Sequence, residues 1–152
     1  MAESSNSSGF SRAERDAMKA RAEELRAMRG GQKKSDYLTA LVKTIDEMPK
    51  EDQEIAIAVH QIVSEVAPDL IPRTWYEMPA RGKDGDVVVF VQVSSQFGMR
   101  YSTLGFQGAT LLDDGDMWPT SYAIMQITDE VKSTIRSLIT RATAPEHSDD
   151  RR

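Results

Sequence analysis

The stretch that decides the fold runs from Thr74 to Val93 and reads TWYEMPARGKDGDVVVFVQV. Its second half, VVVFVQV at 87–93, is rich in β-branched residues and predicts a strand that is apolar on both faces. The tetrad Gly-Lys-Asp-Gly at 82–85 has the composition of a tight turn. We therefore expect residues 87–93 to form a central strand of a sheet.

Further strands are indicated on both sides of this one. The segments WYEMPA at 75–80, MRYSTLGF at 99–106 and SYAIMQI at 121–127 have the residue types of strands. The turns between the earlier segments are too short for a parallel crossover, which needs about a dozen residues. We predict a mostly antiparallel sheet of four or five strands.

Helices are predicted where apolar residues recur every three or four positions. Residues 36–48 and 50–66 show this spacing on either side of Pro49, which stops the first helix and suits the first turn of the second. A third stripe begins after Thr128, a good N-cap, and reaches Ala142. Because helices and strands occur in separate runs, we expect an α+β fold in which a helical hairpin and a C-terminal helix pack on the sheet.

An extra helix is predicted near the N-terminus. Ser11 and Glu14 form a capping-box sequence, and good helix formers fill 12–29 before Gly30 and Gly31. Segment 11–34 holds eight Lys or Arg against four Asp or Glu. This helix could contact an acidic partner or the acidic body of the same chain, but the interpretation we favour is a solvated helix with ion pairs between its own residues. We divide the chain into a disordered tail at 1–10, the basic helix at 11–34, an α+β domain at 35–142 and a disordered tail at 143–152.

Length and composition exclude several classes of protein. The 152 residues suit one domain, and the formal net charge of -5 argues against a nucleic-acid partner. The sequence has no Cys, which excludes disulfides, thiolate metal sites and a cysteine nucleophile. There is no apolar window long enough to cross a membrane, and the first residues do not read as a secretory signal. We expect a cytoplasmic protein without a membrane partner, present as a monomer or weak homodimer.

Signatures of common enzyme sites are missing from the sequence. His60 and His147, its two imidazoles, lie far apart, and there is no Gly-x-Ser-x-Gly elbow, Walker loop or G-x-G-x-x-G after a strand. We interpret His60 as a satisfied residue at the edge of the helix at 50–66. The chain is therefore not expected to be an enzyme.

Aromatic residues suggest one candidate binding site. Eight of the ten aromatic residues lie between 75 and 122, and Tyr and Trp combine apolar area with a polar tip. A cleft for a small molecule or peptide would be lined by Trp75, Tyr76, Met78, Pro79, Tyr101 and Trp118. The competing interpretation, which we favour, is ordinary packing in the core.

Carboxylates suggest a second candidate. Asp113, Asp114 and Asp116 lie within four residues around Gly115, and carboxylate oxygens suit hard cations such as calcium, magnesium or ferrous iron. The sequence also fits a solvated turn, which is the favoured interpretation. Another acidic group flanks Pro49 and comprises Asp46, Glu47, Glu51, Asp52 and Glu54. Negative charge in the first turn of a helix would offset its dipole and explains Glu51 and Asp52 without a metal.

Two passages carry a resemblance to a known family: PDLIPRTWYEMPARGKDGDVVVFVQVSSQFGMRYSTLGF at 68–106 and LLDDGDMWPTSYAI at 111–124. Over residues 36–141 the chain resembles the YdhG-like family, a domain of unknown function that is also described as iron-chaperone or frataxin-like. The aromatic-x-Met-Pro step at 76–79 is its most recognisable piece, although family members often have Gly where this chain has Glu77. The N-terminal helix resembles an actinobacterial-type branch.

The resemblance implies a compact α+β fold with helices against an antiparallel sheet. It also implies weak binding of iron to surface carboxylates, for which residues 46–54 are the best analogue. The first functional hypothesis is therefore a non-enzymatic iron-binding chaperone of frataxin-like type. The alternative is a binding module that takes a small molecule or a protein partner's peptide in the aromatic cleft.

Overall fold

The computed structural model describes residues 9–28, 30–108 and 110–144. Three helices come first: α1 (Arg12–Arg26), α2 (Gly31–Asp46) and α3 (Lys50–Val66). The strands follow as β1 (Ile71–Trp75), β2 (Met78–Lys83), β3 (Asp86–Gln92), β4 (Ser102–Phe106) and β5 (Ser121–Ile124), with a short 3-10 turn, Ser94–Gln96, after β3. Helix α4 (Asp129–Ala142) ends the described chain. The predicted α+β class is confirmed.

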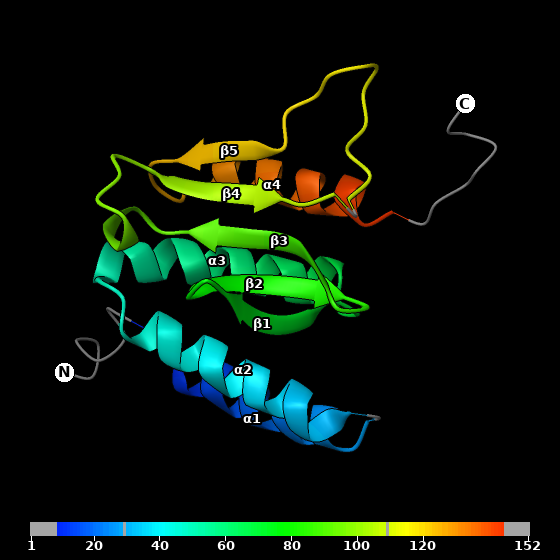
Figure 1. The fold of residues 1–152 in the computed structure, drawn as a ribbon. Coiled ribbons are helices and arrows are strands. Elements are labelled where there is room, and N and C mark those ends of the chain that lie inside the picture. Colours follow the sequence, from blue (N-terminus) through cyan, green and yellow to red (C-terminus); the bar gives the residue numbers. More distant parts are fainter. Residues whose placement is uncertain (1–8, 29, 109, 145–152) are drawn as a thin grey trace.

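The strands of this part of the chain form one sheet in the order β1-β2-β3-β4-β5, and every neighbouring pair is antiparallel. Strand β3 lies in the middle, as the apolar run at 87–93 predicts. Figure 1 shows α3 and α4 on the same side of the sheet, with α1 and α2 side by side beyond the β1 edge. Among the described residues, no helix is both long and apolar enough to cross a membrane.

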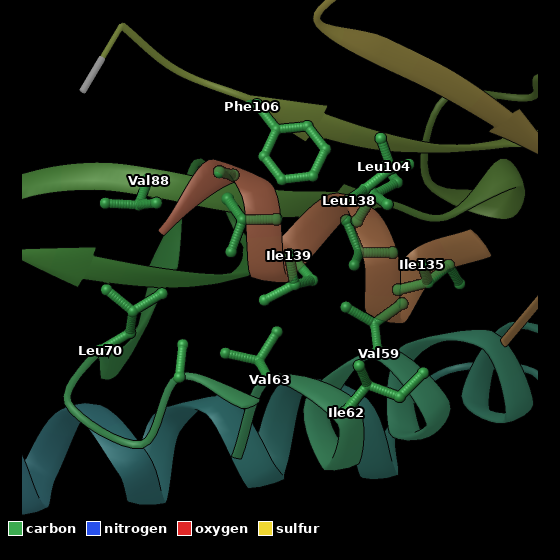
Figure 2. Packing of buried hydrophobic residues seen from close by; sticks show 14 of the residues in the cluster. Val59, Ile62, Val63, Leu70, Val88, Leu104, Phe106, Ile135, Leu138 and Ile139 are labelled. Atoms are coloured by element: carbon green, nitrogen blue, oxygen red, sulfur yellow. The ribbon is translucent and has the colours of Figure 1, made fainter. Parts of the chain in front are cut away.

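The main core lies between the sheet and the helices α3 and α4. Figure 2 shows side chains of α4 between those of the sheet and those of α3, including Ile135, Leu138 and Ile139. Leu104 and Phe106 come from β4, and Val59 and Val63 from α3. Burial of such apolar side chains, each contributing about 1.5–3 kcal/mol, holds the three elements together.

A second apolar cluster attaches α1 and α2 to the body. It comprises Phe10, Leu25, Leu38, Leu41, Ile45 and Ala56. Phe10 is only 6% exposed, so assigning it to a disordered tail is wrong. The aromatic ring of Phe10 packs in the same apolar cluster as residues of α1 and α3. A prediction of disorder that is based on the Ser content of residues 1–10 does not take this packing into account. The remaining tail assignments, 1–8 and 145–152, lie outside the described residues.

The turn between α1 and α2 differs from the sequence prediction. Helix α1 ends at Arg26, and α2 begins at Gly31, so Lys33 and Lys34 belong to α2 and not to the basic N-terminal helix. A Cβ at Gly31 would overlap the backbone carbonyls that end α1. The pair Gly30-Gly31 therefore begins a helix as well as ending one.

A tight turn divides the predicted strand at 75–80. Trp75 on β1 pairs with Met78 on β2, and the two residues between them, Tyr76 and Glu77, both have positive φ. Two consecutive residues with positive φ are the mark of a type I′ hairpin turn. The φ of +64° at Glu77 also gives a physical reason for a glycine at this position.

Candidate binding pocket

The most unusual side chain of the fold is that of Arg81 on β2. It is 5% exposed and points with its strand partners Pro72 and Val89 toward α3. The register of β2 and β3 shifts immediately after Arg81, and such a β-bulge changes the direction in which side chains point.

Neutral acceptors hold the guanidinium of Arg81. Its Nη2 donates to Nδ1 of His60 at 2.8 Å, to Oγ of Ser64 at 2.8 Å and to the His60 carbonyl at 3.2 Å. Its Nη1 donates to the carbonyl of Leu70 at 3.4 Å. The acceptors come from the last turns of α3 and the loop after it, where the partial negative charge of the helix dipole lies.

No carboxylate among the described residues forms an ion pair with this buried cation. Burial and, to a smaller extent, the nearby positive charge of Arg21 together lower the pKa of Arg81 to about 10. A buried charge is expensive unless it is paired. The folded protein therefore keeps a positive charge at this point at a cost in stability.

The imidazole of His60, which accepts a hydrogen bond from Arg81, is neutral. Burial and, to a smaller extent, the positive charge of Arg81 together lower the pKa of His60 to about 3. Because Nδ1 accepts a hydrogen bond, the proton of the neutral ring is assigned to Nε2. The ring of Phe10 packs edge-on against the imidazole, with 5.8 Å between ring centroids.

Arg81 and His60 line a pocket of about 610 Å³ between α1, α3 and the β1–β2 hairpin. This volume lies in the range of sites for small organic molecules, about 300–1,000 Å³. Most of the exposed surface of the wall is apolar, and the apolar lining residues are Phe10, Ala17, Met18, Leu38, Pro68 and Pro72. The polar residues are Glu14, Arg21, Glu24, His60, Gln61, Ser64, Glu65 and Arg81.

The acidic residues of the pocket already have partners. Glu24 pairs with Arg21 at 3.1 Å, and Glu65 pairs with Arg136 at 2.7 Å. Glu14 accepts hydrogen bonds from the backbone of Ser11 in the predicted capping box and from the side chain of Gln61. Glu14 and Arg81 are therefore the two charged residues of this pocket that lie outside the ion pairs of the described residues, and Arg81 is the one that is positive.

The acidic bend at 46–54 has structural roles at two of its positions. Asp46 accepts two hydrogen bonds from Arg15 of α1, at 2.9 and 3.2 Å. Asp52 is 4% exposed and accepts hydrogen bonds from the hydroxyls of Ser94 and Ser95. The other three members, Glu47, Glu51 and Glu54, are exposed.

The carboxylates Asp113, Asp114 and Asp116 lie in an exposed loop between β4 and β5, where Gly115 has a φ of +74°. Within the described parts of the chain, no group of three or more His, Cys, Asp or Glu is arranged to hold a metal ion. Neither this loop nor the bend at 46–54 has the geometry of a closed metal site.

The predicted aromatic cleft is divided between separate places. Trp75 is half-buried and contacts Tyr76 and Phe90, with ring centroids 5.0 and 5.2 Å apart. Trp118 packs instead against the main core. Of the other predicted residues, Met78 and Pro79 are buried, Tyr76 is 76% exposed and Tyr101 lies under the guanidinium of Arg100. The described residues that line the 610 Å³ pocket include none of the six.

Arg81 and His60 are the site residues that sequence reasoning misses. The only local signal is a charged residue between the predicted strand segment at 75–80 and the predicted turn at 82–85, and the orientation of Arg81 depends on the bulge that follows it. Comparison of the chain with family models, with curated proteins and with solved structures finds no match. The pocket must therefore be interpreted from its own chemistry.

Proposed function

We propose that this chain is a non-enzymatic binding protein for a small organic acid, which it holds in the pocket of Arg81 and His60. The single observation that carries the proposal is the buried guanidinium without a counterion. A ligand carboxylate would supply the missing negative charge in surroundings where an ion pair is only weakly screened by solvent.

The donors of Arg81 leave room for such a ligand. Among the hydrogen bonds of the described residues, Nη2 makes three, Nη1 makes one and Nε makes none. A guanidinium has five N–H groups in a planar fork that matches a carboxylate. The N–H of Nε and one N–H of Nη1 have no partner among the described residues. They point to different sides of the guanidinium, so each could donate to a single oxygen of an incoming anion.

The walls of the pocket indicate the body of the ligand. Apolar side chains such as Met18, Leu38 and Pro72 line the same pocket as the cation. They favour an aliphatic or aromatic chain over a sugar or a free inorganic ion. We therefore expect a monocarboxylate with an apolar body, bound with its acid group inward.

Iron delivery, which the YdhG-like resemblance implies, stays a prediction, as does the resemblance itself. The pocket supports the small-molecule alternative, but at a different place from the predicted aromatic cleft. We keep the expectation that the protein makes and breaks no covalent bond. The proposal rests on the positive charge of Arg81 and on the shape of the pocket, and both are properties of a binding site.

The experiment is a calorimetric titration with a panel of medium-chain and aromatic carboxylic acids, each compared with its primary amide. The amide keeps the shape of the acid and removes its charge. We expect saturable binding of at least one acid, weakened by about tenfold or more in its amide. Equal binding of acid and amide, or no saturable binding across the panel, would overturn the proposal.

A further inference from the structure

A second groove lies beside the β1–β2 hairpin, apart from the Arg81 pocket. It has a volume of about 520 Å³ and lies between the start of α2, strand β1 and the turn between β2 and β3. Its charged and aromatic wall, called here the basic groove, comprises Lys33, Lys34, Tyr37, Arg73 and Lys83. Arg73 follows Pro72 on β1, and successive side chains of a strand point to opposite faces. The two sites therefore use opposite faces of the hairpin.

Positive charge converges in the basic groove. The Nζ of Lys33 lies 5.8 Å and the guanidinium carbon of Arg73 lies 5.5 Å from the centroid of the same ring, that of Tyr37. Asp69 and Asp84 also line the groove, yet none of its charged residues takes part in an ion pair within the described chain. Four cations against two carboxylates leave an excess of positive charge here.

Arg73 provides a second and independent observation. Its Nη1 donates to the carbonyl of Gly85 at 3.2 Å, but its Nε is buried and has no hydrogen-bond partner in the described structure. Buried donors are almost always paired, and an unpaired one costs stability. An anion in the groove would reduce the repulsion between Arg73 and Lys33.

The first turn of α2 adds to the positive potential. Its sequence, GQKK, has no acidic residue, and the N-cap Gly30 has no side chain to cap the backbone N–H groups. This end of a helix carries partial positive charge. Lys33 and Lys34 add further positive charge to this first turn, a position at which Asp and Glu are favoured.

We infer that the basic groove is a binding site for a small phosphate-bearing molecule. Several converging cations match an anion that carries more than one charge, and lysine ammonium groups bind phosphate as point charges. The groove also has the volume of a small-molecule site. The inference stands independently of the proposed function, because it uses other residues on another face.

The test is a titration with inorganic pyrophosphate, followed by calorimetry and by amide NMR. We expect saturable binding, with shifts confined to residues 30–37, 69–73 and 82–85. The double variant Lys33→Gln/Lys83→Gln should bind about tenfold more weakly. Its matched control is Lys19→Gln/Lys132→Gln, which removes the same charge from exposed positions on α1 and α4 and should change affinity by less than about twofold.

Two results would overturn the inference. One is the absence of saturable pyrophosphate binding, and the other is an equal loss of affinity in both double variants, which would indicate a general charge effect. Sedimentation with vesicles of phosphatidylglycerol tests whether the phosphate comes from a lipid headgroup or from a dissolved ligand. Sedimentation with these vesicles without saturable binding of pyrophosphate would count against the site as inferred. Lys33 and Lys83 are exposed, so the variants should fold, and their melting temperatures verify this.

Discussion

Nη2 of Arg81 on β2 lies 2.8 Å from Nδ1 of His60 on α3. This hydrogen bond joins the sheet to the helix and requires a charged guanidinium and a neutral imidazole at the same time. An ion pair would join the sheet and the helix at a smaller cost in stability, because a carboxylate would compensate the buried charge. The pair therefore leaves a positive charge available to a ligand, which is the basis of the proposed function.

Replacing Arg81 should separate stability from binding. Arg81→Met removes the uncompensated buried charge and keeps most of the volume, but it also removes the hydrogen bonds to His60 and Ser64. Relief of the desolvated charge should offset the loss of these hydrogen bonds, each of which contributes about 0.5–1.5 kcal/mol. We expect the free energy of unfolding to stay within about 1 kcal/mol of the original value or to rise by about 1–2 kcal/mol, while binding of the organic acid is lost. Urea denaturation and calorimetry measure the two effects. A loss of several kcal/mol would indicate that Arg81 is structural.

The pH dependence of stability should report on His60. Its pKa is about 3 in the folded protein against an ordinary value of 6.5, so the unfolded chain binds more protons between these values. Stability is complete above about pH 6.5 and is lost as the pH falls toward about 3. From about pH 7.5 to pH 5 the loss from this group should be about 2 kcal/mol.

Comparison with His60→Gln isolates this contribution from those of the carboxylates. Glutamine keeps an acceptor for Arg81 and does not titrate. The free energy of unfolding of the original protein minus that of His60→Gln should fall by about 2 kcal/mol from about pH 7.5 to pH 5. A constant difference would mean that His60 protonates equally well in the folded and unfolded states.

The hairpin turn between β1 and β2 offers a stabilising substitution. Glu77 has a φ of +64°, which glycine adopts without the steric cost of a Cβ atom. We expect Glu77→Gly to raise stability by about 0.5–1 kcal/mol, observed as a higher melting temperature. Glu54→Gly, at an exposed position inside α3, is the reverse control and should lower stability by a similar amount. A lower melting temperature for Glu77→Gly would contradict the turn geometry.

The acidic bend should divide into structural and neutral positions. Asp52 accepts hydrogen bonds from Ser94 and Ser95 while almost fully buried, so Asp52→Ala should destabilise the protein by about 1–3 kcal/mol. The exposed Glu54→Gln should change stability by less than about 0.5 kcal/mol. Chemical denaturation measures both. Equal effects would argue that the bend acts as one unit, as an iron patch would.

Much of the fold can be predicted from short-range patterns. The apolar run at 87–93 predicts β3 and its central place, because a strand buried on both faces needs neighbours. The stripes around Pro49 predict α2 and α3, although α2 begins earlier, at Gly31. The turn at Tyr76 and Glu77 is not predicted, since neither residue type favours positive φ and the strand pairing imposes it.

The candidate site depends on long-range packing, which the sequence does not reveal. His60 and Arg81 are 21 positions apart and meet only because β2 lies against the end of α3. Phe10, in a segment that reads as a tail, closes the same pocket. The residue types that attract functional interpretation, the carboxylates and aromatics, are spread over separate surfaces by the same packing.

The central claim is that Arg81 binds the acid group of a ligand, and NMR of the arginine side chains tests it most directly. The Nε–H signal of Arg81 is assigned by its disappearance in Arg81→Met and then followed while an acid from the panel, or its amide, is added. The account predicts a saturable shift of this signal with the acid and none with the amide. A bound acid that leaves the Arg81 signal in place would contradict it.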